Sequence, residues 1–413
     1  MLRIVFRISV LAIIILSSAP FNYPIAGHSQ DTKLQREFIE DDGFTQVSTI
    51  TNQEVKTIYL SGQVGQGENL REHVESAFQG VVTRLESVGA TVDDVVKIRI
   101  YVKNFKPEDY AVVRDTRLQV FNEAHWPAST LLGVQSLYLE PMTVEIEAIA
   151  IIPDSLAPNN SLKREYAEPS NGFHQTVSVK SNGLKTIYVS GQVAQGDDLA
   201  EQAESIYKNL AQRLEAAGAK LTDIVKLNTY ITDFNPQRDL TALRQSRSKV
   251  FDTANLPAST LIGVQSLAAD NFKIEIDAIA VVAEKGYQPP KKQFIEPAQG
   301  FTQVVTSKED RAKTIYLSGQ VGRPGDALEM QVDQVFANLR KRLEAAGASP
   351  NDLLKITIYM ANYTPGDADG LGTAMTRYGF PQDKSSAVTL IGIPSLFSET
   401  ALIEVEGIAV AEE

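Results

Sequence analysis

"TIYLSGQVGQGENL" (residues 57–70) occurs in three versions in this chain of 413 residues. It returns as "TIYVSGQVAQGDDL" from Thr186 and as "TIYLSGQVGRPGDAL" from Thr314. The serines at its centre are spaced by 129 and then 128 residues, at Ser61, Ser190 and Ser318. A period of this length is that of a whole domain and is too long for one turn of a solenoid. The repeat therefore predicts tandem domains.

Two later motifs repeat in the same register. "PASTLLGVQSL" from Pro127 returns from Pro257 as "PASTLIGVQSL" and from Ser386 as "SAVTLIGIPSL". "VEIEAIA" from Val144 returns as "IEIDAIA" and "IEVEGIA". Segments rich in proline and polar residues separate the units, as linkers do. The predicted domains, which we call copy 1, copy 2 and copy 3, span residues 37–153, 164–284 and 292–413.

Within one copy the pattern predicts the order β-β-α-β-α-β-β. Alternating or β-branched stretches from Gly43 and Val55 favour two strands. Apolar residues between Asn69 and Val88 follow helical spacing, and a glycine then ends the helix in each copy. These glycines are Gly89, Gly218 and Gly347. A second helix is expected from Glu108 to Asn122, so the fold class is α+β with helices on one face of a sheet.

Composition and charge limit the partners and the location. Hydrophobic residues make up 43% of the chain, and the net charge of −12 makes a nucleic acid an unfavourable partner. Arg3 and Arg7 precede an apolar run from Ile8 to Leu16. This predicts a signal peptide over residues 1–29, with an uncleaved anchor as the alternative. We expect a periplasmic or secreted protein, not held by a membrane after cleavage.

Glycine-rich turns between a strand and a helix often bind phosphate. Here the spacing of Gly62, Gly65 and Gly67 fits neither a dinucleotide-binding turn nor a Walker loop. Acidic residues at the start of the helix, such as Glu68, would repel a phosphate. The glycines instead indicate close backbone approach at an interface or a ligand pocket.

Taken together, "SGQV" after a strand, "AAGA" before "DIVK", and "PAST" followed by "EIEAIA" or its variants resemble the Rid/YjgF family of reactive-intermediate deaminases. The resemblance covers residues 37–413 three times. It implies a chorismate-mutase-like trimer with small-molecule pockets between subunits, and hydrolysis of enamines and imines without metal or cofactor. Because the copies are linked, we expect an intramolecular pseudo-trimer formed by one monomeric chain. Three separate domains are the alternative.

The resemblance also shows what this chain lacks. Active members carry P-A-R-S/T, whose arginine holds the substrate carboxylate, and the matching residues here are Ser129, Ser259 and Val388. Neither a hydroxyl nor an isopropyl group replaces a bidentate guanidinium. A tyrosine near the pocket of many relatives is a phenylalanine in every copy. Copy 3 departs furthest from the family pattern, which suggests a structural role.

The resemblance implies a set of site residues. The expected catalytic carboxylates are Glu147, Asp277 and Glu406, with a rim carboxylate paired to a lysine such as Lys97 as the alternative. The expected ligand-binding residues are Phe44, Gly62, Arg114, Ser129, Leu131, Gln135, Phe173, Gly191, Arg244, Ser259, Leu261, Gln265, Phe301 and Gly319. For Arg114 and Arg244 the hypothesis is that they bind the anionic group of the ligand in place of the missing arginine. The alternative is that they lie on a solvated helix face, where such charges are usual.

The four histidines show no metal-binding spacing, so we expect no metal and no cofactor. The predicted function is small-molecule binding at clefts between copies, with hydrolysis of a C=N bond at a non-standard site. A binding module without catalysis and a scaffold are the alternatives.

Overall fold

The computed structural model describes residues 34–413 except residues 42, 155–161, 253–254, 310 and 384. The predicted signal peptide lies outside these residues. The described residues belong to one compact unit. No helix among them is long and apolar enough to span a membrane.

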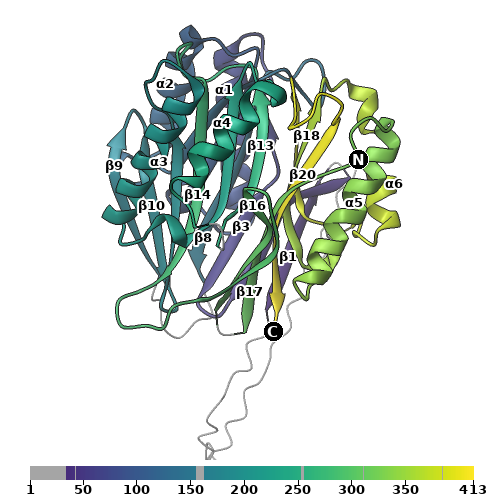
Figure 1. The fold of residues 1–413 in the computed structure, drawn as a ribbon. Coiled ribbons are helices and arrows are strands. Elements are labelled where there is room, and N and C mark those ends of the chain that lie inside the picture. Colours follow the sequence, from purple (N-terminus) through teal and green to yellow (C-terminus); the bar gives the residue numbers. More distant parts are fainter. Residues whose placement is uncertain (1–33, 42, 155–161, 253–254, 310, 384) are drawn as a thin grey trace, which may run out of the picture. The chain divides into compact units, whose positions relative to one another are not determined.

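Each copy contains a set of paired strands and two main helices (Figure 1). The strands of copy 1 are β1 (Gln35–Asp41), β2 (Phe44–Asn52), β3 (Val55–Leu60), β4 (Gln63–Val64), β5 (Val95–Lys103), β6 (Ala128–Val134), β7 (Ser136–Leu137) and β8 (Val144–Pro153). Its helices are α1 (Leu70–Glu86) and α2 (Tyr110–Val120).

The other copies repeat this order. Copy 2 contains β9 (Lys163–Ser170), β10 (Phe173–Ser181), β11 (Leu184–Gln192), α3 (Leu199–Ala216), β12 (Ile224–Thr232), α4 (Pro236–Ser248), β13 (Ala258–Val264) and β14 (Ile274–Ala283). Copy 3 contains β15 (Lys291–Ala298), β16 (Phe301–Glu309), β17 (Ala312–Val321), α5 (Leu328–Ala345), β18 (Leu353–Ala361), α6 (Leu371–Arg377), β19 (Ala387–Ile393) and β20 (Ile403–Glu412).

The three tandem α+β copies are confirmed, with one addition. A strand precedes the two predicted N-terminal strands in each copy, namely β1, β9 and β15. These strands are largely half-exposed or exposed, as in "QREFIED" of β1, so they carry no apolar run that would indicate a strand. The predicted glycine ends of the first helices are confirmed, because Gly89, Gly218 and Gly347 all have φ between +69° and +79°.

The sheets pass from one copy to the next. Copy 1 has the strand order β1-β2-β3-β8-β5-β6, in which β5 and β6 run parallel. Copies 2 and 3 share one sheet because β13 pairs with β16 at Ala258 and Thr302. The short strand β7 of copy 1 pairs in turn with β19 of copy 3. Backbone pairing therefore connects neighbouring copies.

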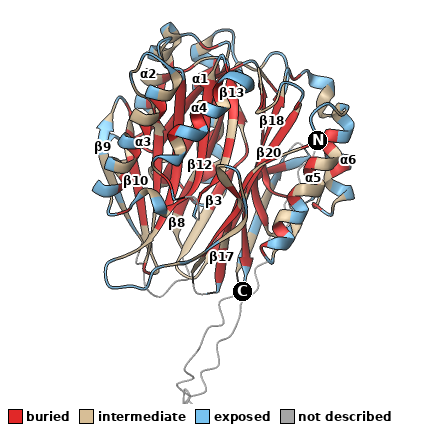
Figure 2. Ribbon diagram, in the orientation of Figure 1, coloured by how far each residue is buried: buried red, intermediate tan, exposed pale blue. Residues whose placement is uncertain are grey.

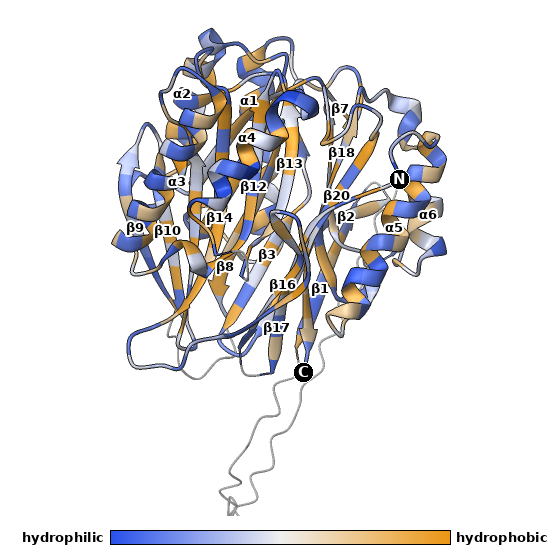
Figure 3. Cartoon of the chain, viewed as in Figure 1, coloured by the Kyte–Doolittle hydropathy of each residue, from blue (hydrophilic) through white to orange (hydrophobic). Residues whose placement is uncertain are grey.

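The helices lie outside the strands, and burial follows this layering. Figure 2 shows buried residues concentrated in the strands, and Figure 3 shows hydrophilic residues on the outer sides of the helices. Each first helix packs its apolar stripe on the sheet of its own copy, as Phe78 and Leu85 do in α1. The inner faces of the sheets form further apolar clusters that combine all three copies.

The repeated serine of the opening motif bonds one copy to another. Ser190 Oγ accepts from the backbone N–H of Ser129 at 2.8 Å, and Ser318 Oγ accepts from that of Ser259 at 2.7 Å. Ser61 Oγ accepts from the N–H of Val388 at 2.7 Å. These bonds connect copy 1 to copy 2, copy 2 to copy 3 and copy 3 to copy 1. Each hydroxyl also donates within its own copy, so the motif's serine serves assembly of the copies.

Candidate functional site

The glycine after each of these serines makes room for a buried glutamate. A Cβ at Gly319 would lie 1.7 Å from Glu404 Oε1, which is far closer than two atoms that are not bonded to each other can approach. Gly191 stands in the same relation to Glu275, and Gly62 to Glu145, each at 1.6 Å. The glycines predicted as ligand-binding residues therefore serve close approach, and what approaches them is a carboxyl group.

These glutamates favour the protonated state. Burial raises the pKa of Glu404 to about 8, and the negative charge of Glu406 adds to the shift. Burial raises the pKa of Glu275 to about 8 as well, with a further contribution from Asp277. Burial also raises the pKa of Glu145 to about 8. A carboxyl group with such a pKa can donate and accept protons near neutral pH.

One of these glutamates lies in a cavity between two copies. Glu404 of copy 3 lines a cavity of about 250 Å³ whose other walls come from both copy 2 and copy 3. Five predicted ligand-binding residues line the same cavity: Arg244, Ser259, Leu261, Phe301 and Gly319. We call this cavity the 2/3 cleft. Sequence reasoning thus found much of its wall but missed Glu404.

The 2/3 cleft also contains an arginine that the resemblance did not single out. Arg247 of α4 lines the cleft and donates from Nη1 to Ser259 Oγ at 3.0 Å. Its guanidinium Cζ lies 5.6 Å from the centre of the Phe251 ring. Within the described chain, Nε and Nη2 of Arg247 have no hydrogen-bond partner. The resemblance matches Ser259 to an arginine of active family members, so here a guanidinium from α4 contacts the serine at that position.

The corresponding contact region between copies 1 and 2, around Arg117 and Ser129, is arranged differently, and we call it the 1/2 cleft by analogy with the 2/3 cleft. Arg117 of α2 donates to Ser129 Oγ at 3.0 Å, but its Nη2 also donates to the carbonyl oxygen of Asn171 in copy 2 at 2.7 Å. Its Cζ lies 5.2 Å from the centre of the Phe173 ring. Arg117 is only 2% exposed, so it is fixed inside the interface.

The region between copies 3 and 1 lacks a comparable guanidinium in its described part. Val388 and Leu390 stand where Ser259 and Leu261 stand in copy 2, and the short helix α6 carries threonines at the matching helix positions. Its arginine, Arg377, pairs with Asp333. Phe44 is 42% exposed there, and the N–H of Gly62 donates to Val388.

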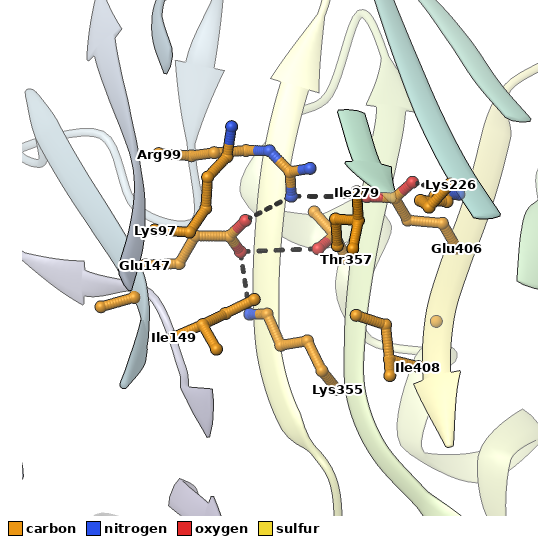
Figure 4. A pocket seen from close by; sticks show the side chains of 12 residues that line it. Lys97, Arg99, Glu147, Ile149, Lys226, Ile279, Lys355, Thr357, Glu406 and Ile408 are labelled. Atoms are coloured by element: carbon orange, nitrogen blue, oxygen red, sulfur yellow. Dashed lines mark hydrogen bonds and ion pairs between the residues drawn. The ribbon is translucent and has the colours of Figure 1, made fainter. Parts of the chain in front are cut away.

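The carboxylates predicted as catalytic lie elsewhere. Glu147, Asp277 and Glu406 are buried around the guanidinium of Arg99, where the three copies meet. Figure 4 shows Glu147 and Glu406 beside Arg99. Arg99 donates to Asp277 through Nε at 2.9 Å and to Glu147 through Nη1 at 2.9 Å. Its Nη1 lies 3.8 Å from Glu406. We call this cluster, with Lys97, Lys226 and Lys355, the axial network.

The axial network lowers the pKa values of two of the carboxylates expected to be catalytic. Burial alone would raise the pKa of Glu147, but the charges of Lys355 and Arg99 outweigh it and lower the pKa to about 2. For Asp277, Arg99 and Lys97 likewise outweigh burial and lower the pKa. The carboxyl groups of Glu147 and Asp277 are therefore held ionised by their cationic partners, which does not suit the proton transfer expected of a catalytic acid. The alternative given above was a carboxylate paired with a lysine such as Lys97. Such pairs are present, but Lys97 of copy 1 pairs with Asp277 of copy 2.

Of the other predicted residues, some contact another copy or the core, and others lie at the surface. Arg114 pairs with its neighbour Asp115 at 2.7 Å, and Arg244 is exposed at the 2/3 cleft. Gln135 and Gln265 bond other copies through their backbone N–H groups, to Gly392 and Gly133, and do not line the 2/3 cleft. Leu131 is buried in the apolar core of copy 1.

Comparison with known proteins agrees with this architecture. The model of the family described as Endoribonuclease L-PSP matches residues 43–152, 165–282 and 291–411. The chain belongs to this family, whose relatives include the Rid/YjgF proteins that the motifs resemble. Each copy therefore represents one family unit.

Curated relatives match over the length of one copy. The chain is 29% identical over 123 residues to a 2-iminobutanoate/2-iminopropanoate deaminase of Dermatophagoides farinae, covering 28% of this chain and 89% of that protein. It is 34% identical over 105 residues to the Rattus norvegicus protein of the same name, covering 24% and 73%. A solved chorismatase is similar in fold, with a TM-score of 0.50, 13% identity, and coverage of 77% of this chain and 93% of the other.

Proposed function

We propose that the 2/3 cleft binds a small imine or enamine that carries a carboxylate and hydrolyses it to a ketone and ammonia. The observation that carries this proposal is that Glu404 and Arg247 line the same cavity. The names of the two deaminase relatives support the reaction class. A carboxyl group held protonated by burial and a guanidinium with unused donors are the two groups this reaction needs.

Arg247 is proposed to bind the substrate carboxylate. Its Nε and Nη2 are buried donors without a partner in the described chain, and leaving such donors unpaired is costly. A carboxylate accepts two parallel N–H bonds from a guanidinium. Arg247 replaces Arg244 as the proposed anchor, because Arg244 is exposed whereas Arg247 contacts Ser259.

Glu404 is proposed to transfer the protons. Its carboxyl group first protonates the imine nitrogen. As a carboxylate it then takes a proton from the water whose oxygen bonds to the imine carbon. Glu404, protonated again, then donates its proton to the carbinolamine nitrogen. The C–N bond breaks to release ammonia, and the carboxylate takes the hydroxyl proton as the C=O group forms, so atoms and charge balance.

The test uses matched glutamates. We expect Glu404→Gln to lower the rate of ammonia release from freshly generated 2-iminobutanoate by about 10²–10⁴-fold, the usual contribution of a general acid–base. Glu275→Gln is the control, because Glu275 has the same raised pKa but does not line the 2/3 cleft. Equal rates for wild type and Glu404→Gln would contradict the proposal.

Binding without turnover is the alternative, and the same measurements separate it from catalysis. If ligand binding to the wild type requires Arg247 but no ammonia is released, the cleft is a binding site only. A scaffold role predicts neither binding nor turnover.

We further propose that the working unit is one chain acting as an intramolecular pseudo-trimer. The cyclic serine bonds between copies support this, since each interface is supplied from within the chain. Light scattering after size-exclusion chromatography should give the mass of a single chain, and a multiple of that mass would contradict it.

Export is proposed from the first residues of the sequence. The mature chain should begin near residue 30 and be recovered outside the cytoplasm. N-terminal sequencing of the purified protein tests this, and an intact Met1 would contradict it.

A further inference from the structure

The axial network carries more positive than negative charge. Lys97, Lys226, Lys355 and Arg99 meet the carboxylates of Glu147, Asp277 and Glu406, and the carboxylates and lysines are at most 7% exposed. Four cations thus face three anions. A buried charge without a counter-charge is unfavourable because it has lost its hydration.

Neighbouring groups do not cancel this excess at neutral pH. Burial raises the pKa values of Glu145, Glu275 and Glu404 to about 8, so these side chains are mainly uncharged there. The network also touches three tyrosine hydroxyls, from Tyr101, Tyr230 and Tyr359. Burial raises the pKa of each of these tyrosines well above its ordinary value, so they too remain neutral.

The three lysines of the axial network differ in how many acceptors they contact. Lys97 Nζ donates to Thr130 Oγ1 and to the carbonyl oxygen of Val189, and lies 3.3 Å from Asp277. Lys226 has the corresponding three partners in Thr260, Leu317 and Glu406.

Lys355 differs from both. Its Nζ contacts Thr389 Oγ1 at 2.5 Å and Glu147 at 2.9 Å, and the described part of the chain offers it no third acceptor. A buried ammonium with an unused N–H indicates that a further acceptor belongs beside it.

A cavity lies beside these groups. It measures about 40 Å³, and its apolar side is formed by Ile149, Ile279 and Ile408 (Figure 4). Its polar side is formed by all three lysines and Arg99 together with Glu147, Glu406 and Thr357, so four cations and two carboxylates line it. A water molecule needs about 10–15 Å³ on the same measure, so the cavity suits one small ion and not a metabolite.

We propose that the cavity of the axial network binds one monovalent anion of the size of chloride. The anion would accept the third N–H of Lys355 and neutralise the excess charge shared by Arg99 and the lysines. The apolar isoleucine wall disfavours a larger hydrated anion. This site is separate from the 2/3 cleft and does not depend on the function proposed there.

A rival explanation is loss of a proton from one lysine. Burial lowers the pKa of Lys97 to about 8, although Asp277 opposes the shift. A neutral lysine would remove the excess charge and leave the cavity to water. The two explanations differ in whether a halide is present.

Diffraction from wild-type crystals grown in sodium bromide tests the proposal directly. We expect an anomalous bromine peak in the cavity, within hydrogen-bonding distance of Lys355 Nζ. An anomalous map without a peak in the cavity, or density that refines as water, overturns the proposal. This measurement needs no variant and is therefore decisive even if substitutions in the network prevent folding.

A solution measurement adds a matched pair of variants. At constant ionic strength, replacing gluconate by bromide at neutral pH should raise the melting temperature of the wild type, as expected for a ligand of the folded state. Arg99→Gln removes the excess charge and should abolish this rise. Arg36→Gln is the control, because Arg36 pairs with Asp352 outside the network. A rise that persists in Arg99→Gln contradicts the proposal.

Discussion

The 1/2 cleft and the 2/3 cleft contain equivalent residues in different states. Each has an arginine that donates to a serine at 3.0 Å, and each has a buried glutamate beside a glycine. In the 1/2 cleft the arginine also donates across the interface to the carbonyl of Asn171. In the 2/3 cleft two nitrogens of Arg247 lack partners among the described residues. Among the described residues, one hydrogen bond to the adjoining copy thus leaves Arg117 with a single unpartnered nitrogen, Nε, where Arg247 has two.

This difference shows what tandem copies allow. Three identical subunits would carry three identical clefts, so a change that closed one would close all. In a single chain, one cleft can become part of the interface while its neighbour keeps free donors. The sequence differences between copies can therefore be interpreted as differences between sites.

The two arginines should give the largest difference between the clefts. Arg247→Ala should lower kcat/KM for a carboxylate-bearing imine by roughly 100-fold, since two bonds to a charged group contribute about 1.5 kcal/mol each. Arg117→Ala should leave kcat/KM nearly unchanged but lower the free energy of unfolding, because Arg117 is buried in the interface. Steady-state kinetics and urea unfolding of both variants check this, and equal kinetic losses would show that the clefts are equivalent.

The glycines beside the buried glutamates should give a smaller difference between the clefts. A Cβ at residue 319 or 191 would overlap the adjacent glutamate, so Gly319→Ala and Gly191→Ala should each lower the free energy of unfolding by about 1–3 kcal/mol. Only Gly319→Ala displaces Glu404, and it should also reduce turnover by roughly tenfold. Ammonia-release rates measured at matched folded fractions separate the two effects. A similar loss of turnover in Gly191→Ala would place activity in the 1/2 cleft as well.

The pH dependence sharpens the assignment to Glu404. Because burial raises its pKa to about 8, the proton donor is present below that pH and is lost as the pH rises through it. Turnover should therefore be lower by about tenfold at pH 9 than at pH 7. The kcat profile of Glu275→Gln should keep this limb, whereas any residual activity of Glu404→Gln should lack it.

The smallest expected effect concerns the ring beside Arg117. Phe173→Leu removes a cation–π contact and should lower the free energy of unfolding by about 0.5–1 kcal/mol. Phe301→Leu, at the matching position in the 2/3 cleft, should instead raise KM, because Phe301 lines that cavity. Unfolding and kinetic measurements on the pair test this, and identical effects would contradict it.

Much of the fold was predictable from the sequence because periodicity is local information. The repeat predicted the three copies, and helical spacing predicted the first helices together with their glycine ends. The additional strand of each copy was missed because its residues are largely polar and half-exposed. Such a strand depends on pairing with its neighbour more than on its own apolar pattern.

The site was less predictable because contacts between copies determine which side chains line it. Glu404 and Glu406 lie two residues apart on one face of β20, so the sequence cannot say which of them meets a cation from another copy. Lys226, which pairs with Glu406, belongs to copy 2. Arg247 was missed as an anchor for a similar reason, since its contact with Ser259 requires the relative placement of α4 and β13. The sequence signals for Glu404 were the glycine that it approaches and the glutamate that recurs at this place of the motif in every copy.

Arg99 has no counterpart in the other copies, where Asn228 and Thr357 occupy the matching strand positions. A homotrimer carries every central side chain three times, so it cannot have a single guanidinium where its subunits meet. Fusion of the units into one polypeptide removes that restriction. The middle of this protein can therefore differ from copy to copy, one side chain at a time.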